Sequence, residues 1–422
     1  ASQLAKSGKS VLVIEKGKYY HESDLVDDAQ EGYGNLYEHG GCAFTSGGSV
    51  ALMAGSVFGG GTTVNWSASL KLQHFVREEW AKQGLSYFLS PKFSKDLDTV
   101  YERIGATTDK IRHNGSNKMF MKGCKALGYP FSEIEQNIGT KPHECNLCFS
   151  GCRAGVKNGT MNTWLRDAHQ HDAKFLDQSK VKKVIIEDGK AVGVECLVHY
   201  EKTILIKADR VIVSAGSLQS PGVLLRSGLK NKNIGQHLHI HPATMIFGQF
   251  NESLRAFEGS LMSSMSIIAE DTENDGYGCK LEAISLQPDQ FAPVLPWRGA
   301  MNHKESMMRL EQFSAILVMA RDKDSLGSVE YDQNENVKSC YDLSQRDRRS
   351  MIDGMIRAAD IIVGGGGRQV YTSQFGVKPF KFEANEESSV GNERFIRWKD
   401  SMRQYGLPDH GSSMMSAHQM GT

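Results

Sequence analysis

A short apolar strand that ends in an acid constrains the fold of this chain more than any other feature. Residues 11–15 read VLVIE, and a short stretch with Lys, Ser and Gly precedes them. The second strand of a Rossmann-type βαβ unit ends in this way, with its acid placed to hydrogen-bond a ribose. The sequence therefore predicts a nucleotide-binding α/β domain with Glu15 as a ribose ligand, although an acid at a strand end is more often simply solvated.

Both ends of the chain stop inside such motifs. The Gly-rich turn of a βαβ unit lies about twenty residues before its acid, and here that position precedes Ala1, which is not an initiator Met. The last residues, SAHQMGT, also read as an interrupted motif. We therefore expect the sequence to be a piece of a longer protein, and a missing targeting or anchoring signal carries no weight.

Composition bounds the class of protein. The chain has 422 residues, 49 basic and 49 acidic side chains, and 43 glycines that cluster without forming a repeat. This length allows two or three domains, and the balanced charge does not favour nucleic acid as a partner. Eight unevenly spaced cysteines suit a reducing compartment better than a disulfide scaffold. No apolar stretch approaches the about 20 residues of a membrane span.

Hydrophobic periodicity predicts the order of the elements. Residues 180–199 indicate a hairpin with its turn at Asp188 and Gly189, and residues 203–216 indicate two further strands. Alternating stretches in residues 244–340 predict an antiparallel sheet. The predicted helices have an apolar stripe and polar or Gly ends, and they lie at 75–85, 93–106, 117–129, 164–171, from Ser220 onward, and 342–367.

Two Gly-containing segments point to a bound planar or phosphorylated group. Residues 58–66 read FGGGTTVNW, where three glycines let a backbone approach such a group and the Thr and Asn side chains add donors. Residues 210–229 read as a strand, a tight turn at Ala215-Gly216 and a helix start with Pro221 in its first turn. Taken singly, the first segment also fits a Gly-rich hairpin turn and the second an ordinary strand–helix junction.

The cysteine-rich segment leaves several interpretations open. Cys145, Cys148 and Cys152 follow His143, and the C-x2-C spacing suits zinc or an iron–sulfur cluster. A four-ligand site needs a further partner, such as His143, Cys124 or Cys42. We favour structural free thiols, with a metal or cluster as the second interpretation and a disulfide as the third.

Taken in order, five blocks resemble the glucose-methanol-choline (GMC) oxidoreductase family of FAD enzymes. They are VLVIEKG, AGSVFGGGTTVNWSASL, VIVSAGSLQSPGVLLRSGL, NIGQHLHIHP and HQMGT, and they run through almost the whole chain. Within that family, GGGTTVNWSASLK, VREEWAKQGL and ECNLCFSGCRAGVKNGTMNTWLRDA are most similar to long-chain fatty alcohol oxidases. The resemblance implies a Rossmann-type FAD-binding domain joined to an antiparallel-sheet substrate domain.

The resemblance also implies a set of site residues. Glu15 would hold the adenosine ribose of FAD, and Val184 would give the adenine a backbone contact. The residues implied along the pyrophosphate, the flavin and the neighbouring turn are Gly59, Gly60, Thr62, Thr63, Asn65, Ala215 and Gly216. The family usually has serines after its paired glycines, and here Gly61 and Thr62 take those places, so Gly61 lacks a hydroxyl.

His418 matches the active-site histidine of the family and is implied as the general base. The second catalytic His or Asn of the family follows some forty residues later, beyond Thr422. His239 and His241 alternate in HLHIHP and so resemble a metal pair, but in the family this stretch is a structural connection. We assign no metal.

The implied domains alternate along the chain. They are an FAD-binding part at 1–70, a helical lid at 71–140, a second FAD-binding part at 141–243, a substrate domain at 244–400 and a return to the active site at 401–422.

The implied reaction is oxidation of long-chain primary alcohols to aldehydes, with O2 reduced to H2O2. The alternatives are a GMC dehydrogenase with another electron acceptor, an NAD-dependent dehydrogenase, and a non-catalytic flavin- or lipid-binding fragment. The resemblance further implies a peroxisomal or internal-membrane location, and it leaves membrane association and oligomer formation open.

Overall fold

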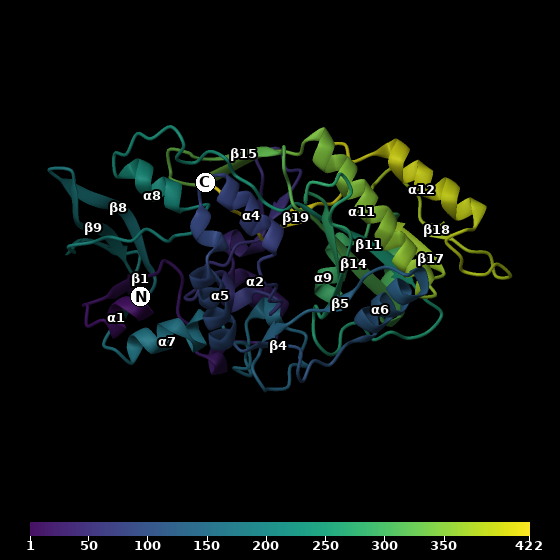
Figure 1. Cartoon of the computed structure of the whole chain (residues 1–422), viewed down its shortest axis with the longest axis horizontal. Helices are drawn as coiled ribbons and strands as arrows, with labels where there is room; N and C mark the ends of the chain where they lie inside the picture. Colours follow the sequence, from purple (N-terminus) through teal and green to yellow (C-terminus); the bar gives the residue numbers. More distant parts are fainter.

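A computed structural model describes residues 1–422, which form two unlike ends joined by helices and loops (Figure 1). One end holds β1 (Leu12–Ile14), paired in parallel with β7 (Lys174–Leu176). The other end is dominated by an antiparallel sheet covered by long helices. This arrangement confirms the predicted α/β chain with a separate antiparallel-sheet region, while the five domain boundaries stay a prediction.

The end of the molecule that holds β1 and β7 also carries the predicted hairpin. Strands β8 (Ser179–Glu187) and β9 (Lys190–Val198) pair antiparallel, and β10 (Lys202–Lys207) adds a third strand. Asp188 and Gly189 have φ values of 47° and 74°. A two-residue turn with positive φ at both positions matches the right-handed twist of a hairpin, so the turn prediction is confirmed.

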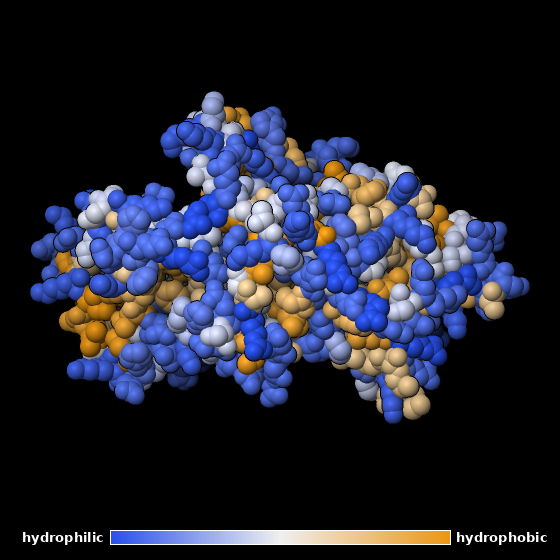
Figure 2. Space-filling view, turned by 90° about the horizontal axis from the view of Figure 1, so that it is seen from below, coloured by the Kyte–Doolittle hydropathy of each residue, from blue (hydrophilic) through white to orange (hydrophobic).

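The second strand predicted within residues 203–216 is wrong. The chain is in no regular element between Ala208 and Gly216, and Ile212 is 70% exposed. An apolar run becomes a strand only when a neighbouring strand accepts and donates its backbone hydrogen bonds, and no strand lies beside this one. Leu12 in β1 is also exposed, and Figure 2 shows apolar surface at this end of the molecule.

The predicted antiparallel sheet is confirmed and is larger than expected. Four long strands form its centre: β11 (Ala243–Gln249), β14 (Phe313–Ala320), β13 (Cys279–Ile284) and β12 (Ser264–Ala269). Short strands extend it to ten: β2 (Ala43–Phe44), β3 (Ala51–Leu52), β5 (Ser132–Glu133), β17 (Gln369–Thr372), β18 (Phe380–Lys381) and β19 (Met415–Ser416). Strands β15 (Leu326–Tyr331) and β16 (Val337–Asp342) form a separate ribbon, and β4 (Ala106–Thr107) pairs with β6 (Gln136–Asn137).

Several helices begin or end at capping residues. Ser344 caps the start of α11 by accepting the N–H of Asp347, and Gly105 ends α5 in a left-handed conformation. The α-helices are α1 (Ser2–Lys6), α2 (Ala29–Leu36), α3 (Gly61–Val64), α4 (His74–Lys82), α5 (Pro91–Ile104), α6 (Gly115–Leu127), α7 (Trp164–His169), α8 (Ser220–Arg226), α9 (Pro288–Val294), α10 (Ala300–Met308), α11 (Gln345–Gly364) and α12 (Glu393–Tyr405). None of them combines the length and the apolar character that crossing a bilayer requires.

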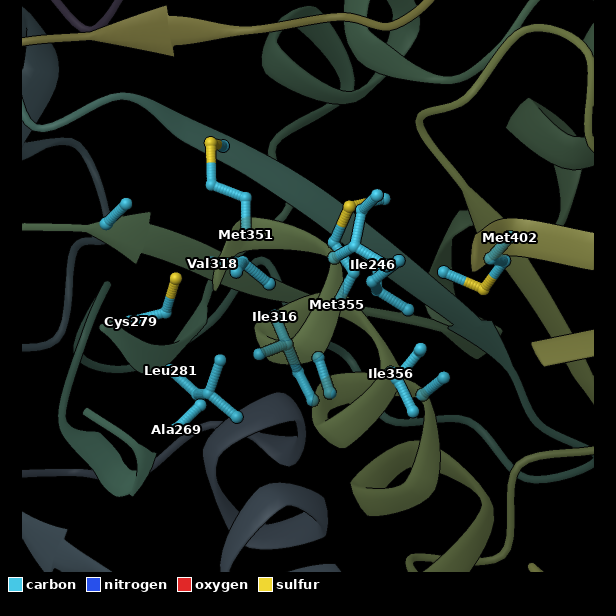
Figure 3. Close-up of a cluster of buried hydrophobic side chains, with 14 of the residues drawn as sticks. Ile246, Ala269, Cys279, Leu281, Ile316, Val318, Met351, Met355, Ile356 and Met402 are labelled. Atoms are coloured by element: carbon cyan, nitrogen blue, oxygen red, sulfur yellow. The ribbon is translucent and has the colours of Figure 1, made fainter. Parts of the chain in front are cut away.

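The two faces of the central sheet bury two different cores. Because side chains alternate along a strand, Ile246 of β11 joins the core beneath α11, whereas Met245 and Phe247 join the core on the opposite face. Figure 3 shows the first core, where Ile316 of β14 lies among Met355 and other side chains of α11. Burial on both faces explains why β11 and β14 are apolar at nearly every position.

Helices α6 and α11 approach so closely that one contact has no room for a side chain. A Cβ added at Gly123 would lie 2.1 Å from the carbonyl oxygen of Ile361. We predict that Gly123→Ala lowers the free energy of unfolding by about 2–3 kcal/mol, because the helices must separate. Gly34 in α2 is exposed, with no atom near its added Cβ, so Gly34→Ala should raise that free energy by about 0.5–1 kcal/mol. Urea unfolding of both variants measures the opposite signs, and equal effects would contradict the close contact.

Candidate active site

The structure brings together sequence blocks that lie far apart in the chain. The turn after Glu15 packs on the start of the Gly-rich segment, since a Cβ at Gly17 would lie 2.6 Å from the backbone of Val57. The N–H of Phe58 donates to the carbonyl of Lys18 at 3.0 Å. The first two predicted cofactor-binding blocks are therefore neighbours in space.

The C-terminal block joins them through a parallel strand pair. Strand β19 pairs with β3, with Met415 beside Ala51, and the N–H of Met53 donates to Ser416 at 2.8 Å. Gly55, two residues further, lies against the backbone of Gly60. This register brings the strand that precedes His418 beside the strand that leads into the triple-glycine segment.

The third block, around Ala215-Gly216, completes the cluster. The hydroxyl of Ser217 donates to the carbonyl of Gln419 at 2.9 Å, and the hydroxyl of Thr422 donates to the carbonyl of Ser217 at 2.6 Å. Ala215 and Gly216 themselves are exposed, and Gly216 has a φ of 76°. The turn thus presents bare backbone beside the C-terminal segment.

Glu15 is half-buried at the tip of β1. Its Oε1 accepts the N–H of Gly17 at 2.7 Å, and burial raises the pKa of its carboxyl. A second acid, Glu38, was not predicted, and it accepts from Gln219 Nε2 at 2.9 Å and pairs with Lys16. Burial alone would raise the pKa of Glu38, but Lys16, Ser56 and His39 together lower it below its usual value. Glu38 lies in an irregular segment whose sequence has no periodic pattern, so no signal identified it.

The Gly-rich segment leaves open space beside its backbone, which fits the FAD implied by the resemblance. Gly60 has a φ of 56°, and no atom lies within 4 Å of the Cβ position at Gly60, Gly61 or Gly216. A flat ring or a phosphate can therefore reach these peptide groups without meeting a side chain. Gly59 differs, because a Cβ there would lie 2.6 Å from Thr63 Oγ1.

The predicted polar contacts of this segment are less direct. Thr62 Oγ1 donates to the carbonyl of Gly59 at 2.7 Å, and Thr63 Oγ1 donates to the carbonyl of Phe58 at 3.0 Å. Both hydroxyls shape the loop from inside, whereas the side chain of Asn65 is exposed. The N–H of Val184 donates to Ser227 Oγ at 2.8 Å and so is already engaged. The roles of these residues toward FAD stay predictions.

A second histidine faces His418. The two Nδ1 atoms of His241 and His418 are 3.4 Å apart, and the ring planes meet at 72°. Burial and the neighbouring His418 lower the pKa of His241 to about 4, and burial lowers the pKa of His418. Both imidazoles are therefore neutral at pH 7. The sequence suggests for His241 only half of a metal pair or part of a structural connection, because its contact with His418 exists only in the folded chain.

Asp322 fixes the loop that carries His241. Its buried carboxylate accepts the N–H groups of His241 and Ile240 at 3.1 and 3.4 Å and the hydroxyl of Tyr341 at 2.9 Å. His239 Nδ1 also lies 3.1 Å from this carboxylate. His239 therefore helps to hold this loop in place through Asp322. No group of three or more His, Cys, Asp or Glu side chains is arranged to hold a metal ion.

An apolar sheet face extends from the histidine pair. Ala243, two residues after His241, pairs with both Met319 and Met415 and begins the row of β11 side chains that points to this face. The residues that continue the apolar face are Met245, Met265, Leu317, Met319 and Met415. A hollow of about 500 Å³ lies elsewhere and is lined mainly by polar residues, among them Arg112, Lys118 and Arg255.

The cysteine segment supports the Gly-rich segment from behind. Lys157 is buried, and its ammonium donates to the carbonyls of Thr63, Asn65 and Cys148 at 2.8, 2.7 and 3.2 Å. All eight cysteines are free thiols. The Sγ of Cys148 lies 3.0 Å from Nε2 of His143. The sequence showed the cysteines but not the lysine that links them to the cofactor-binding block.

Replacing Lys157 should loosen this support. We expect Lys157→Met to lower the free energy of unfolding by about 2–4 kcal/mol, because three carbonyls lose their donor. Lys174 is exposed on β7, so Lys174→Met is the matched control and should change stability by less than about 0.5 kcal/mol. Chemical denaturation measures both, and equal stability of the two variants would contradict the role of Lys157.

Cys148 should make stability depend on pH. Burial alone would raise the pKa of its thiol, but His143 and Lys157 lower it from 9.0 to about 7. Because the folded pKa lies below the unfolded one, the stabilisation is present above about pH 9 and is lost as pH falls through about 7. Cys148→Ser cannot ionise, so the wild type should gain about 2 kcal/mol over this variant between these pH values. Denaturation across this range tests it, and parallel curves would refute it.

Comparisons with known proteins agree with this geometry. A family model described as GMC oxidoreductase matches residues 33–243. The long-chain-alcohol oxidases FAO4A and FAO4B of Arabidopsis thaliana are 33% and 34% identical to the whole chain, which spans 58% of the length of each. Pyridoxine 4-oxidase from Mesorbium loti superposes on all of the chain with a TM-score of 0.66 at 14% identity and 86% of its own length, which supports the fold alone.

The matched region includes the Gly-rich segment, the cysteine segment and the Ala215-Gly216 turn. The similarity to FAO4A extends over the whole chain. The open backbone at Gly60, Gly61 and Gly216 leaves room for a bound group. The chain belongs to the GMC oxidoreductase family, whose members are flavoproteins that bind FAD.

Proposed function

We propose that this chain forms the active site of an FAD-dependent oxidase that converts long-chain primary alcohols to aldehydes and reduces O2 to H2O2. The observation that supports the proposal is the parallel pairing of β19 with β3, because His418 follows β19 and the open glycine backbone follows β3. Similarity to long-chain-alcohol oxidases along the whole chain supports the substrate class.

His418 has the properties of a general base for the alcohol. Its pKa is lowered by burial, so the ring is neutral and can accept a proton at working pH. The chemistry that bound FAD would supply is an acceptor for the hydride of the alcohol carbon and a source of electrons for O2. His418 would take the hydroxyl proton and hold the substrate oxygen in place during that transfer.

The apolar face beside the histidines suits an alkyl chain. Met245, Met265, Met319 and Met415 are flexible and polarizable, so they can adapt to chains of different length. The same side chains also close the core on this face of the sheet. A GMC dehydrogenase with another electron acceptor would use the same face and the same base, and the yield of peroxide separates the two activities.

Removing the base should slow chemistry without removing the cofactor. In the complete protein, we expect His418→Ala to retain FAD but to reduce it with dodecanol about 10²–10⁴-fold more slowly, because proton transfer loses its acceptor. Rapid-mixing absorbance of the flavin measures this rate. The exposed His74 of α4 gives the control His74→Ala, which should match the wild type.

Three results would count against the proposal. Unchanged flavin reduction in His418→Ala would refute the role of the histidine. Reduction of the flavin without stoichiometric peroxide in air would favour the dehydrogenase. Absence of bound flavin in the complete wild-type protein would leave only a non-catalytic role.

A further inference from the structure

We propose that His241 is a positioning residue that fixes the tautomer of His418, so that Nδ1 of His418 carries its proton and Nε2 faces the substrate as a free lone pair. The inference rests on the proposed function and supplies a partner for the base within this chain. It is carried by the contact between the two rings and by the hydrogen bonds that hold their segments together.

The two rings meet nitrogen to nitrogen. At 3.4 Å between Nδ1 atoms, two lone pairs would repel each other and two N–H groups would collide. One proton must therefore lie between the rings. Since neutral imidazole carries its proton on only one nitrogen, this contact decides which nitrogen of His418 is free.

The two segments cannot easily separate, because backbone bonds frame the histidine pair on both sides. His239 and Met420 exchange two bonds of 2.9 Å, and Ala243 pairs with Met415. Between them, the N–H of His418 donates to Ser416 Oγ at 3.0 Å, and Ser416 donates in turn to the carbonyl of Ile240.

Asp322 holds the other side of the same loop. Its carboxylate accepts the N–H of His241, whose φ of 46° turns the ring toward His418. The left-handed backbone of a non-Gly residue costs free energy and persists only where its surroundings require it. The surrounding hydrogen bonds therefore hold the backbone of His241 in this strained conformation.

Burial and the charges around the pair decide which ring gives the proton. Burial, His418, Arg321 and Lys280 lower the pKa of His241 while Asp322 raises it, whereas burial alone lowers the pKa of His418. Because His241 is the weaker base, a proton taken up by the pair resides on His418. The charged ring has N–H groups on both nitrogens, so its Nδ1–H must donate to His241.

The neutral pair should already have this arrangement. With Nδ1–H of His418 donated to His241, a substrate proton adds to Nε2 and no other bond has to change. The opposite tautomer would place N–H on Nε2 and leave no base toward the substrate. An orienting partner that selects the tautomer of a catalytic histidine has this effect in serine hydrolases.

Direct observation of the tautomer tests the inference apart from activity. In the complete FAD-loaded protein with ¹⁵N-labelled histidine, the nitrogen spectrum at neutral pH should show Nδ1 of His418 protonated and Nε2 unprotonated. His241→Gly should give a mixture of tautomers. Protonated Nε2 in the wild type, or an unchanged His418 spectrum in the Gly variant, would overturn the inference.

Two variants that suit a left-handed backbone test its consequence for rate. Gly removes the ring without strain, and Asn keeps an acceptor at the position of Nδ1. We expect His241→Gly to lower kcat by about tenfold or more with KM little changed, which is less than the about 10²–10⁴-fold loss of the base itself. His241→Asn should restore most of kcat.

The outcomes separate the two proposals. If His241→Asn is as slow as His241→Gly while both unfold at wild-type denaturant concentration, the acceptor at position 241 is irrelevant and the inference fails. If His418→Ala keeps full activity, the proposed function fails, and the tautomer spectrum still decides whether the pair exists.

Discussion

The pairing of β19 with β3 is the contact on which the candidate site depends. It joins Met415 to Ala51 across most of the chain, and the entropy of closing so long a loop must be offset by neighbouring interactions. Those interactions are the sheet itself, in which β19 also pairs with β11, and the bonds of Ser416 to His418 and Ile240. Without this register, the Gly-rich segment and the histidine would be unrelated loops.

Two buried charged groups hold the irregular parts of the site in place. Asp322 gathers the loop of His239 to His241 by accepting backbone and side-chain donors, while Lys157 gathers Thr63, Asn65 and Cys148 by donating to their carbonyls. Loops lack the regular backbone hydrogen bonds of helices and sheets, so their buried peptide groups need such side-chain partners. One group orders the histidine side and the other orders the glycine side.

Local elements followed from the sequence because their causes are local. Caps at Ser344 and Gly105 bound α11 and α5, and the Asp188-Gly189 turn set the β8–β9 hairpin. The strand predicted at residues 211–214 was wrong because a strand needs a neighbouring strand, which the local sequence pattern does not reveal. Apolar periodicity predicts which side chains are buried, but it does not predict whether a partner strand is present.

The sequence by itself determined the family, the α/β architecture, and the identity of Glu15, the glycine segment and His418 as the residues to examine, because these residue types recur at fixed places in short motifs. Only the tertiary structure decided that His241 faces His418, that Glu38 joins Lys16 and Gln219, and that Lys157 supports the glycine segment. These polar side chains come from loops without periodicity. Their partners are set by long-range strand register, which no single stretch of sequence encodes.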